Sequence, residues 1–173
     1  TEAASATVNP GVTRSFPPTP GIDAAGTVAD CSDGCFSLGQ EVLVTGYDLG
    51  MSTSGGFGQY IRVPSAWVVP LPNGLSLRDS MILGTAGFTA ALSVLKLAGN
   101  DVTPEQGEIL VTGATGGVGS IAVALLAKAG YHVVASTGKT SEETMLKELG
   151  AAAVMHRDAL LKGSERPLLK ERW

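Results

Sequence analysis

The chain has 173 residues, of which 44% are apolar and 23 are glycine. This length suits one domain or parts of two, and the composition is typical of an α/β protein with a hydrophobic core. The net charge is −4 and the 12 basic residues are scattered along the chain, so we expect no nucleic-acid partner.

Neither a membrane span nor a secretory signal is expected. The longest apolar stretches, such as 121–127, fall short of the length that crosses a bilayer. The first residues, 1–4, lack a basic region followed by an apolar one. We therefore expect a cytoplasmic protein. Because the chain opens on Thr1 and not on Met, we also expect residues upstream of it.

The first half of the chain predicts a β-rich domain. After an irregular lead-in over 1–20, four short apolar runs follow one another at regular spacing. They lie at 20–28, 39–44, 55–63 and 67–72. The third run alternates apolar and polar residues, and prolines end the fourth. Short strands at this spacing indicate a barrel-like β-domain.

Two cysteines, Cys31 and Cys35, lie four residues apart in this half. With no further cysteine, and with the histidines far away at His132 and His156, they do not make a zinc site. Free thiols in a reducing cytosol are one interpretation, and a local disulfide or redox pair is the other.

Near Leu75 the pattern of short strands ends and a pattern typical of helices begins. Ser76 is a candidate N-cap for the helix that follows it, and residues 84–97 predict a longer helix. We therefore divide the chain into a first domain of residues 1–75 and a second domain of residues 76–173.

A glycine-rich turn between two apolar strands dominates the second half. Residues 108–112 form a β-branched run, and 113–119 read Gly-Ala-Thr-Gly-Gly-Val-Gly. An Ala/Leu/Val segment follows to Lys128, and 131–135 form a second apolar run. Strand, turn, helix and strand make one βαβ unit of a dinucleotide-binding fold. A plain βα turn in another α/β protein is the alternative.

The glycines of this turn have separate tasks. Gly113 turns the chain sharply off the strand because it has no Cβ. Gly116 and Gly117 let the backbone approach a pyrophosphate, and Gly119 lets the helix sit close to the sheet. The phosphate would rest on N–H groups at the start of the helix, where the dipole is positive.

The residues after the second strand predict which dinucleotide binds. NAD sites usually carry an acidic residue about 20 positions past the first glycine, for the ribose 2′-hydroxyl. Here 136–141 read Ser-Thr-Gly-Lys-Thr-Ser, and the next carboxylate is Glu142. Hydroxyls, a glycine and a lysine accept a 2′-phosphate that an acid would repel. We therefore expect NADP(H). Capping of the next helix by Thr140 or Ser141 is a second role for this segment.

The chain continues with a helix over 142–149, which Gly150 stops, and a third strand over 152–155. Residues 158–173 are polar, contain Pro167 and predict no further strand.

Several of these motifs, in this order and spacing, resemble the medium-chain dehydrogenase/reductase superfamily. Its zinc-free quinone oxidoreductase branch, of the YhdH/YhfP type that includes acryloyl-CoA reductase, is the most similar. The resemblance covers about 14–173 and rests on the residues 20–28, 39–42, 84–90 and 111–120.

The resemblance implies a partial GroES-like β-domain followed by a partial Rossmann doubly wound parallel sheet. It implies an NADPH-dependent reductase that transfers a hydride to a quinone or to an α,β-unsaturated acyl-CoA. It also implies a homodimer when the protein has its full length. Zinc-dependent relatives carry a His-Glu pair at Ile22-Asp23 and a Cys at Thr85, so we expect metal-free chemistry.

The cofactor contacts that the resemblance implies fall on eight residues, and no catalytic residue is carried over. The eight are Thr115, Gly116, Gly117, Val118, Thr137, Gly138, Lys139 and Arg157. For Arg157 an ordinary surface charge is the alternative. Thr89 is a candidate neighbour of the nicotinamide, with a packing or capping role as its alternative.

The chain also departs from that family. Matching proteins are about twice as long, and the segment that brings a tyrosine to the nicotinamide would precede Thr1. The later Rossmann strands and much of the substrate pocket would follow Trp173. A non-catalytic NADP(H)-binding fragment, or a structural module of the crystallin type, is therefore the alternative function.

Overall fold

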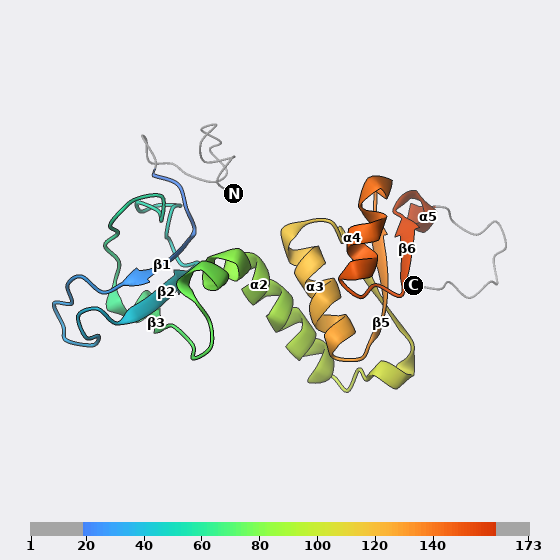
Figure 1. The fold of residues 1–173 in the computed structure, drawn as a ribbon, viewed down its shortest axis with the longest axis horizontal. Helices are drawn as coiled ribbons and strands as arrows, with labels where there is room; N and C mark the ends of the chain where they lie inside the picture. The colour runs from blue at the N-terminus through green and yellow to red at the C-terminus, as the bar shows by residue number, and fades with distance from the viewer. Residues whose placement is uncertain (1–18, 162–173) are drawn as a thin grey trace. The chain divides into compact units, whose positions relative to one another are not determined.

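The structure is a computed structural model that describes residues 19–161 (Figure 1). The chain divides into two compact units, which meet in sequence between Thr85 and Ala86. The division predicted from sequence, with domains 1–75 and 76–173, remains a prediction. The expected lead-in over 1–20 lies almost wholly outside the described residues, as does most of the polar stretch 158–173.

The first unit contains an antiparallel sheet of three strands in the order β1-β2-β3. The strands are β1 (Asp23–Thr27), β2 (Glu41–Thr45) and β3 (Val68–Pro70). The short helix η1 (Ser65–Trp67) leads directly into β3. Among residues 19–85, the buried hydrophobic side chains are Val44 on β2 and Leu49 in the loop after it, with Leu49 fully enclosed.

Three of the four expected strands are confirmed in this unit, and the one expected over 55–63 is wrong. The main-chain amides of 55–57 instead bond to the carbonyls of 19–21, at 2.8–3.0 Å. A Cβ on Gly55 would lie 2.6 Å from the Gly21 carbonyl oxygen. Close backbone approach therefore explains these glycines, and the alternation of the following residues does not correspond to a strand with a buried face.

Helix α2 (Leu77–Ala98) contains the boundary between the units. The expected N-cap is confirmed, because Ser76 Oγ accepts the Asp79 amide at 3.0 Å. By length and composition alone α2 is a candidate membrane span, which corrects the expectation that no apolar stretch is long enough. Gly84 breaks the helix, however, at φ 48° and ψ −151°. The part after the break spans about 21 Å, less than the ~30 Å of a bilayer core.

The second unit contains a parallel sheet of three strands in the order β4-β5-β6, with helices between them (Figure 1). The strands are β4 (Glu108–Thr112), β5 (His132–Thr137) and β6 (Ala153–His156). The helical elements are the C-terminal part of α2, η2 (Pro104–Gln106), α3 (Gly117–Lys128), η3 (Thr140–Glu142), α4 (Glu143–Glu148) and α5 (Asp158–Leu161). Its core is apolar and includes Val111, Val123, Leu126, Val133, Ala135 and Leu146.

The predicted βαβ unit is confirmed in element order and nearly in its boundaries. β4 covers the predicted 108–112, and α3 begins inside the glycine turn at Gly117. β5 runs two residues further than expected, to Thr137. The helix expected over 142–149 is α4, and Gly150, at φ 102°, follows its end. Glu142 stands at the N-cap of α4 without a side-chain cap bond, so the N-cap residue is neither of the two that were expected there.

Candidate functional site

The glycine turn between β4 and α3 is held in a tight arrangement by its own backbone. Gly113 has φ 59°, the left-handed region that favours glycine. The Gly116 amide donates to the Gly113 carbonyl at 2.9 Å. A Cβ on Gly119 would lie 2.8 Å from Ala114 Cα and closer still to the Gly113 carbonyl oxygen. No side chain caps α3, so its first N–H groups remain for a ligand.

A hollow of about 390 Å³ lies beside this turn, where β5 ends. It is lined by Gly113, Thr115, Ser136, Thr137, Gly138, Lys139 and Arg157. Five of the eight predicted cofactor residues therefore meet in one place, although they come from three different segments. The carboxyl ends of parallel strands share one edge of a sheet, which is the usual ligand side of an α/β fold.

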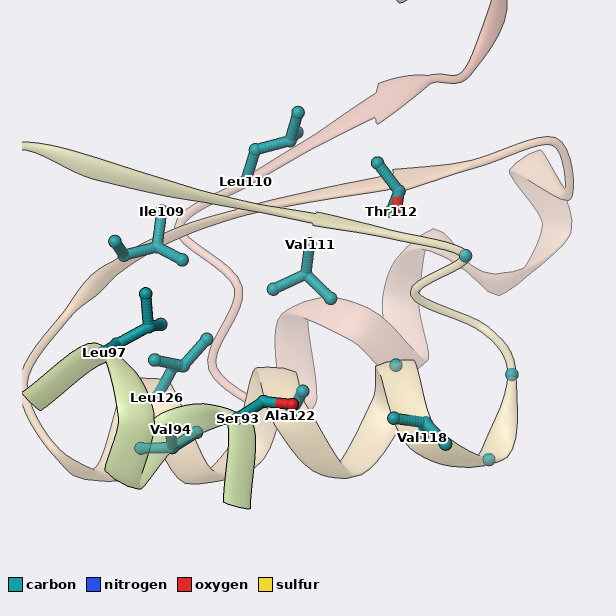
Figure 2. A pocket seen from close by; sticks show the side chains of 14 residues that line it. Ser93, Val94, Leu97, Ile109, Leu110, Val111, Thr112, Val118, Ala122 and Leu126 are labelled. Carbon is teal, nitrogen blue, oxygen red and sulfur yellow. The ribbon is translucent and has the colours of Figure 1, made fainter. Parts of the chain in front are cut away.

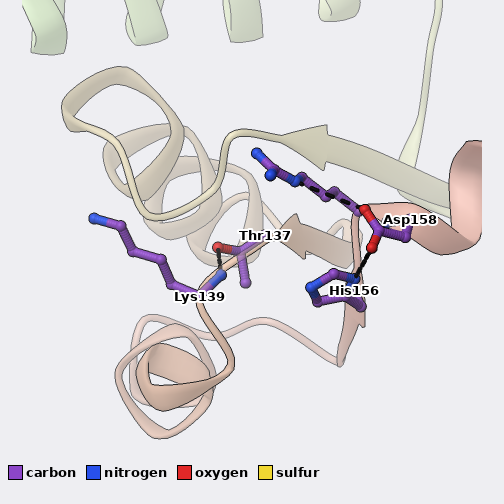
Figure 3. A network of polar contacts seen from close by, with 5 residues as sticks. Thr137, Lys139, His156 and Asp158 are labelled. Carbon is purple, nitrogen blue, oxygen red and sulfur yellow. Dashed lines mark hydrogen bonds and ion pairs between the residues drawn. The ribbon is translucent and has the colours of Figure 1, made fainter.

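Thr137 joins the turn to the end of β5. Its side chain is 3% exposed, and its Oγ1 accepts the Lys139 amide at 3.0 Å. The same oxygen lies 3.1 Å from Thr115 Oγ1. Thr137 Oγ1 accepts the hydrogen bond from the Lys139 amide, and either threonine hydroxyl can donate in the contact between Thr137 and Thr115. The Lys139 and Thr137 bond is visible in Figure 3.

Two basic side chains, those of Lys139 and Arg157, line this hollow. The Arg157 amide donates to the Thr137 carbonyl at 3.0 Å, which fixes Arg157 next to the end of β5. A Cβ on Gly138 would lie 2.9 Å from Arg157 Nε, so the absence of a side chain there makes room for the guanidinium. Arg157 Nε also lies 3.8 Å from the carboxylate of the exposed Asp158, whose other oxygen lies 3.3 Å from His156 Nδ1 (Figure 3). No carboxylate is among the lining residues.

The other three predicted residues, Gly116, Gly117 and Val118, border a second hollow of about 510 Å³. It lies between β4, α3 and the C-terminal part of α2. Figure 2 shows Ile109 and Val111 pointing toward the helices, and Leu110 pointing to the opposite side of the sheet. This second hollow is apolar in character, whereas the first carries the hydroxyl and basic groups.

Two lining residues of the first hollow, Gly113 and Ser136, are not among the eight predicted contacts, although Ser136 begins the segment that was predicted to accept a 2′-phosphate. Gly113 was assigned to the turn alone. Ser136 is 1% exposed, and within the described part of the chain its Oγ has no hydrogen-bond partner. A serine in the buried run of β5 was the available signal, because an unpaired hydroxyl in an apolar strand is costly.

Two residues at the positions where zinc-dependent relatives are expected to carry metal ligands form a hydrogen bond with each other. Thr85 Oγ1 donates to Asp23 Oδ1 at 2.9 Å inside the first unit. Within residues 19–161 no group of three or more His, Cys, Asp and Glu side chains is arranged to hold a metal ion. The Thr89 carbonyl accepts Ser93 Oγ at 2.9 Å, and a role for Thr89 near a nicotinamide remains a prediction.

Comparison with known proteins agrees with this architecture. Residues 4–73 match the family model of the alcohol dehydrogenase GroES-like domain. YhfP of Bacillus subtilis, whose name assigns it to the quinone oxidoreductases, is 52% identical over 162 residues, which are 94% of this chain and 49% of that protein. Acrylyl-CoA reductase AcuI of Ruegeria pomeroyi is 46% identical over 163 residues, again 94% and 49%.

A solved structure shows the same fold. The yhdH oxidoreductase of Salmonella enterica, in complex with NADP, superposes with a TM-score of 0.91 at 46% identity, over 100% of this chain and 53% of that one. These comparisons confirm the resemblance, predicted from sequence, to the medium-chain dehydrogenase/reductase superfamily. Within that superfamily the similar proteins are of the quinone oxidoreductase type, with YhfP and yhdH among them. The chain spans about half the length of these relatives.

Proposed function

We propose that this chain supplies the NADP(H)-binding part of a reductase that transfers a hydride to a quinone or to an α,β-unsaturated acyl-CoA without a metal. The observation that carries the proposal is the hollow at the end of β5, where Lys139 and Arg157 meet the glycine turn and no carboxylate lines the wall. The proposal assigns cofactor contacts to the eight residues predicted from sequence.

The residues present fit such a nucleotide. A diphosphate needs backbone N–H groups at a helix start, and α3 begins at Gly117 without a side-chain cap. A 2′-phosphate needs cationic donors, and Lys139 and Arg157 are exposed basic residues beside one hollow. Thr115 and Thr137 add hydroxyls between these two regions.

The relatives support a nicotinamide dinucleotide as the cofactor, and they do not decide between NADP(H) and NAD(H). The Salmonella enterica structure is a complex with NADP. The Bacillus subtilis yhfP structure, 52% identical to this chain with a TM-score of 0.88, has NAD bound. The preference for NADP(H) in this chain therefore rests on its own Lys139 and Arg157.

A bound nicotinamide would supply the hydride, and this chain's residues would hold and orient the nucleotide. Lys139 and Arg157 would offset the charge at the adenosine end, while the start of α3 would receive the diphosphate. Ile22 has no donor atom for a metal, and Asp23 is hydrogen-bonded to Thr85, which supports metal-free chemistry. The proposal includes the domain division near residue 75, a cytoplasmic location and a homodimer for the full-length protein.

The proposal is tested by titrating the protein with NADPH and with NADH while following nicotinamide fluorescence. We expect tighter binding of NADPH. Lys139→Glu should weaken NADPH binding by about 10–100-fold, the scale of one charge-assisted contact, and leave NADH binding nearly unchanged. Lys128→Glu is the matched control, because Lys128 is exposed at the opposite end of α3.

Equal affinity of the wild-type protein for both nucleotides would refute the role of Lys139.

A second experiment measures turnover as NADPH oxidation with acryloyl-CoA and with a small quinone. Binding of NADPH without turnover of either acceptor would favour the alternative of a non-catalytic NADP(H)-binding module, for which the half-length coverage of the relatives is the supporting observation.

A further inference from the structure

A cluster of polar side chains outside the nucleotide hollow lies in the loop between β1 and β2. Cys31 Sγ donates to Asp33 Oδ1 at 3.1 Å, and the Cys35 amide donates to the same oxygen at 3.1 Å. The Gly34 amide closes the turn on the Cys31 carbonyl at 3.3 Å, with Gly34 at φ 70°. One carboxylate therefore gathers both cysteines of the chain at a single turn.

This loop is held by a contact from a distant part of the sequence. Ser65 Oγ, in η1, donates to Asp33 Oδ2 at 2.5 Å. Cys31 is half-buried and Cys35 is exposed, and both are free thiols. The two thiols are thus within reach of a small molecule in solvent, while the turn that carries them is fixed by Ser65 and by its own backbone.

We propose that Cys31 and Cys35 form a reversible redox-modification site, in which exchange with a small-molecule disulfide such as oxidised glutathione closes an intramolecular disulfide. Cys31 Sγ and the Cys35 amide nitrogen each lie 3.1 Å from Asp33 Oδ1, so they are at most about 6 Å apart, and the Cys31 thiol lies near the backbone that carries the Cys35 side chain. The proposal is independent of the nucleotide-binding function.

The exchange balances in two steps. A protein thiolate attacks the small-molecule disulfide, forms a mixed disulfide and releases one small-molecule thiolate. The second protein thiolate attacks the protein sulfur of that mixed disulfide, forms the bond between Cys31 and Cys35 and releases the second small-molecule thiolate. The protein loses two protons and two electrons, and the small-molecule disulfide is reduced to two thiols.

Asp33 acts as a positioning residue that also slows this exchange. Its hydrogen bond and its negative charge raise the pKa of the Cys35 thiol, with Cys31 as a weaker contributor and Ser65 acting in the opposite direction. The thiolate is the attacking species, so a raised pKa lowers its fraction at neutral pH. Asp33 therefore brings the thiols together and keeps them reduced until an oxidant accumulates.

The test incubates the purified chain in glutathione redox buffer and follows its intact mass. With reduced glutathione at about 0.1 mM, we expect loss of about two mass units and roughly a tenfold excess of this species over the glutathione adduct, because neighbouring thiols reach effective concentrations of about 1 mM. Cys31→Ser and Cys35→Ser should each instead accumulate a single glutathione adduct. Two adducts on the wild-type protein, or disulfide-linked dimers, would overturn the proposal.

A second variant separates positioning from folding. Asp33→Asn should move the pH profile of the first exchange step to lower pH, and it should raise the share of mixed disulfide over ring-closed disulfide at a given pH. Far-UV circular dichroism checks that the variant keeps its fold. An unchanged pH profile together with an unchanged product ratio would refute the role of Asp33.

Tryptophan fluorescence gives an independent readout. Trp67, in the same short helix as Ser65, stacks on Tyr47 with ring centroids 5.1 Å apart and an angle of 2°. In a Trp173→Phe background, ring closure should change the Trp67 emission, and reduction with dithiothreitol should restore it. The Cys31→Ser protein should show neither change, and an identical change in that variant would contradict the link through Asp33.

Discussion

Replacing Gly119 with alanine tests whether the shape of the glycine turn is set by backbone contact. The new Cβ would lie 2.8 Å from Ala114 Cα, and closer to the Gly113 carbonyl oxygen, so two backbone groups obstruct it at once. Neither group can rotate away as a side chain would. Real Cβ atoms essentially never approach other heavy atoms this closely, so the turn or the start of α3 must shift.

The magnitude follows from two opposed effects. Alanine favours a helix over glycine by about 1 kcal/mol. Overpacking costs about 1–3 kcal/mol, and here it falls on backbone. We therefore expect Gly119→Ala to lower the free energy of unfolding by up to about 2 kcal/mol, and to weaken NADPH binding because the amides of the turn move.

Urea unfolding followed by circular dichroism measures the stability, and nicotinamide fluorescence measures the binding. Gly117→Ala is the control for stability alone, because its Cβ would meet only Ala86 Cβ, at an ordinary 3.4 Å. That variant should unfold at the wild-type urea concentration or slightly above it. A Gly119→Ala protein with wild-type stability and wild-type NADPH affinity would refute the contact argument.

Three further predictions follow from single side chains. Leu146→Ala should cost about 2–5 kcal/mol in urea unfolding, because Leu146 is fully buried in the core of the second unit. Thr137→Val should remove the acceptor of the Lys139 amide and weaken NADPH binding measurably, whereas Thr112→Val, on an exposed residue, should leave it unchanged. The hydrogen bond from Ser65 lowers the pKa of Asp33, so the stability that Asp33 contributes is present above its unfolded pKa of about 3.9 and is lost as pH falls below it. The difference in melting temperature between wild type and Asp33→Asn should therefore shrink between pH 6 and pH 3.

The second unit was predictable from sequence because its signals are local. The strand over 108–112, the glycine turn and Gly150 each follow from periodicity or from a glycine conformation that the neighbouring residues require. The expected strand over 55–63 failed for the opposite reason. Its first amides bond to 19–21, more than thirty residues away, and no local pattern encodes that pairing.

The site was predictable only in part, because some of its geometry depends on non-local contacts. Lys139 follows from its place after the second strand, and Arg157 came from family resemblance alone. Gly138 explains how the Arg157 side chain fits. A Cβ at position 138 would lie 2.9 Å from Arg157 Nε, so glycine leaves the room that the guanidinium needs. Ser136 gave no sequence signal beyond its polarity, since its isolation inside β5 appears only once the sheet is formed.

The carboxyl edge of the parallel sheet explains how residues from three segments meet. Thr115 follows β4, Thr137 ends β5 and Arg157 follows β6, and parallel strands deliver their C-termini to the same side. The glycine turn sets the shape at this edge, whereas Lys139 and Arg157 set its charge. In the proposed site those two exposed side chains can be exchanged without disturbing the core, so the proposal predicts that cofactor preference varies independently of the fold.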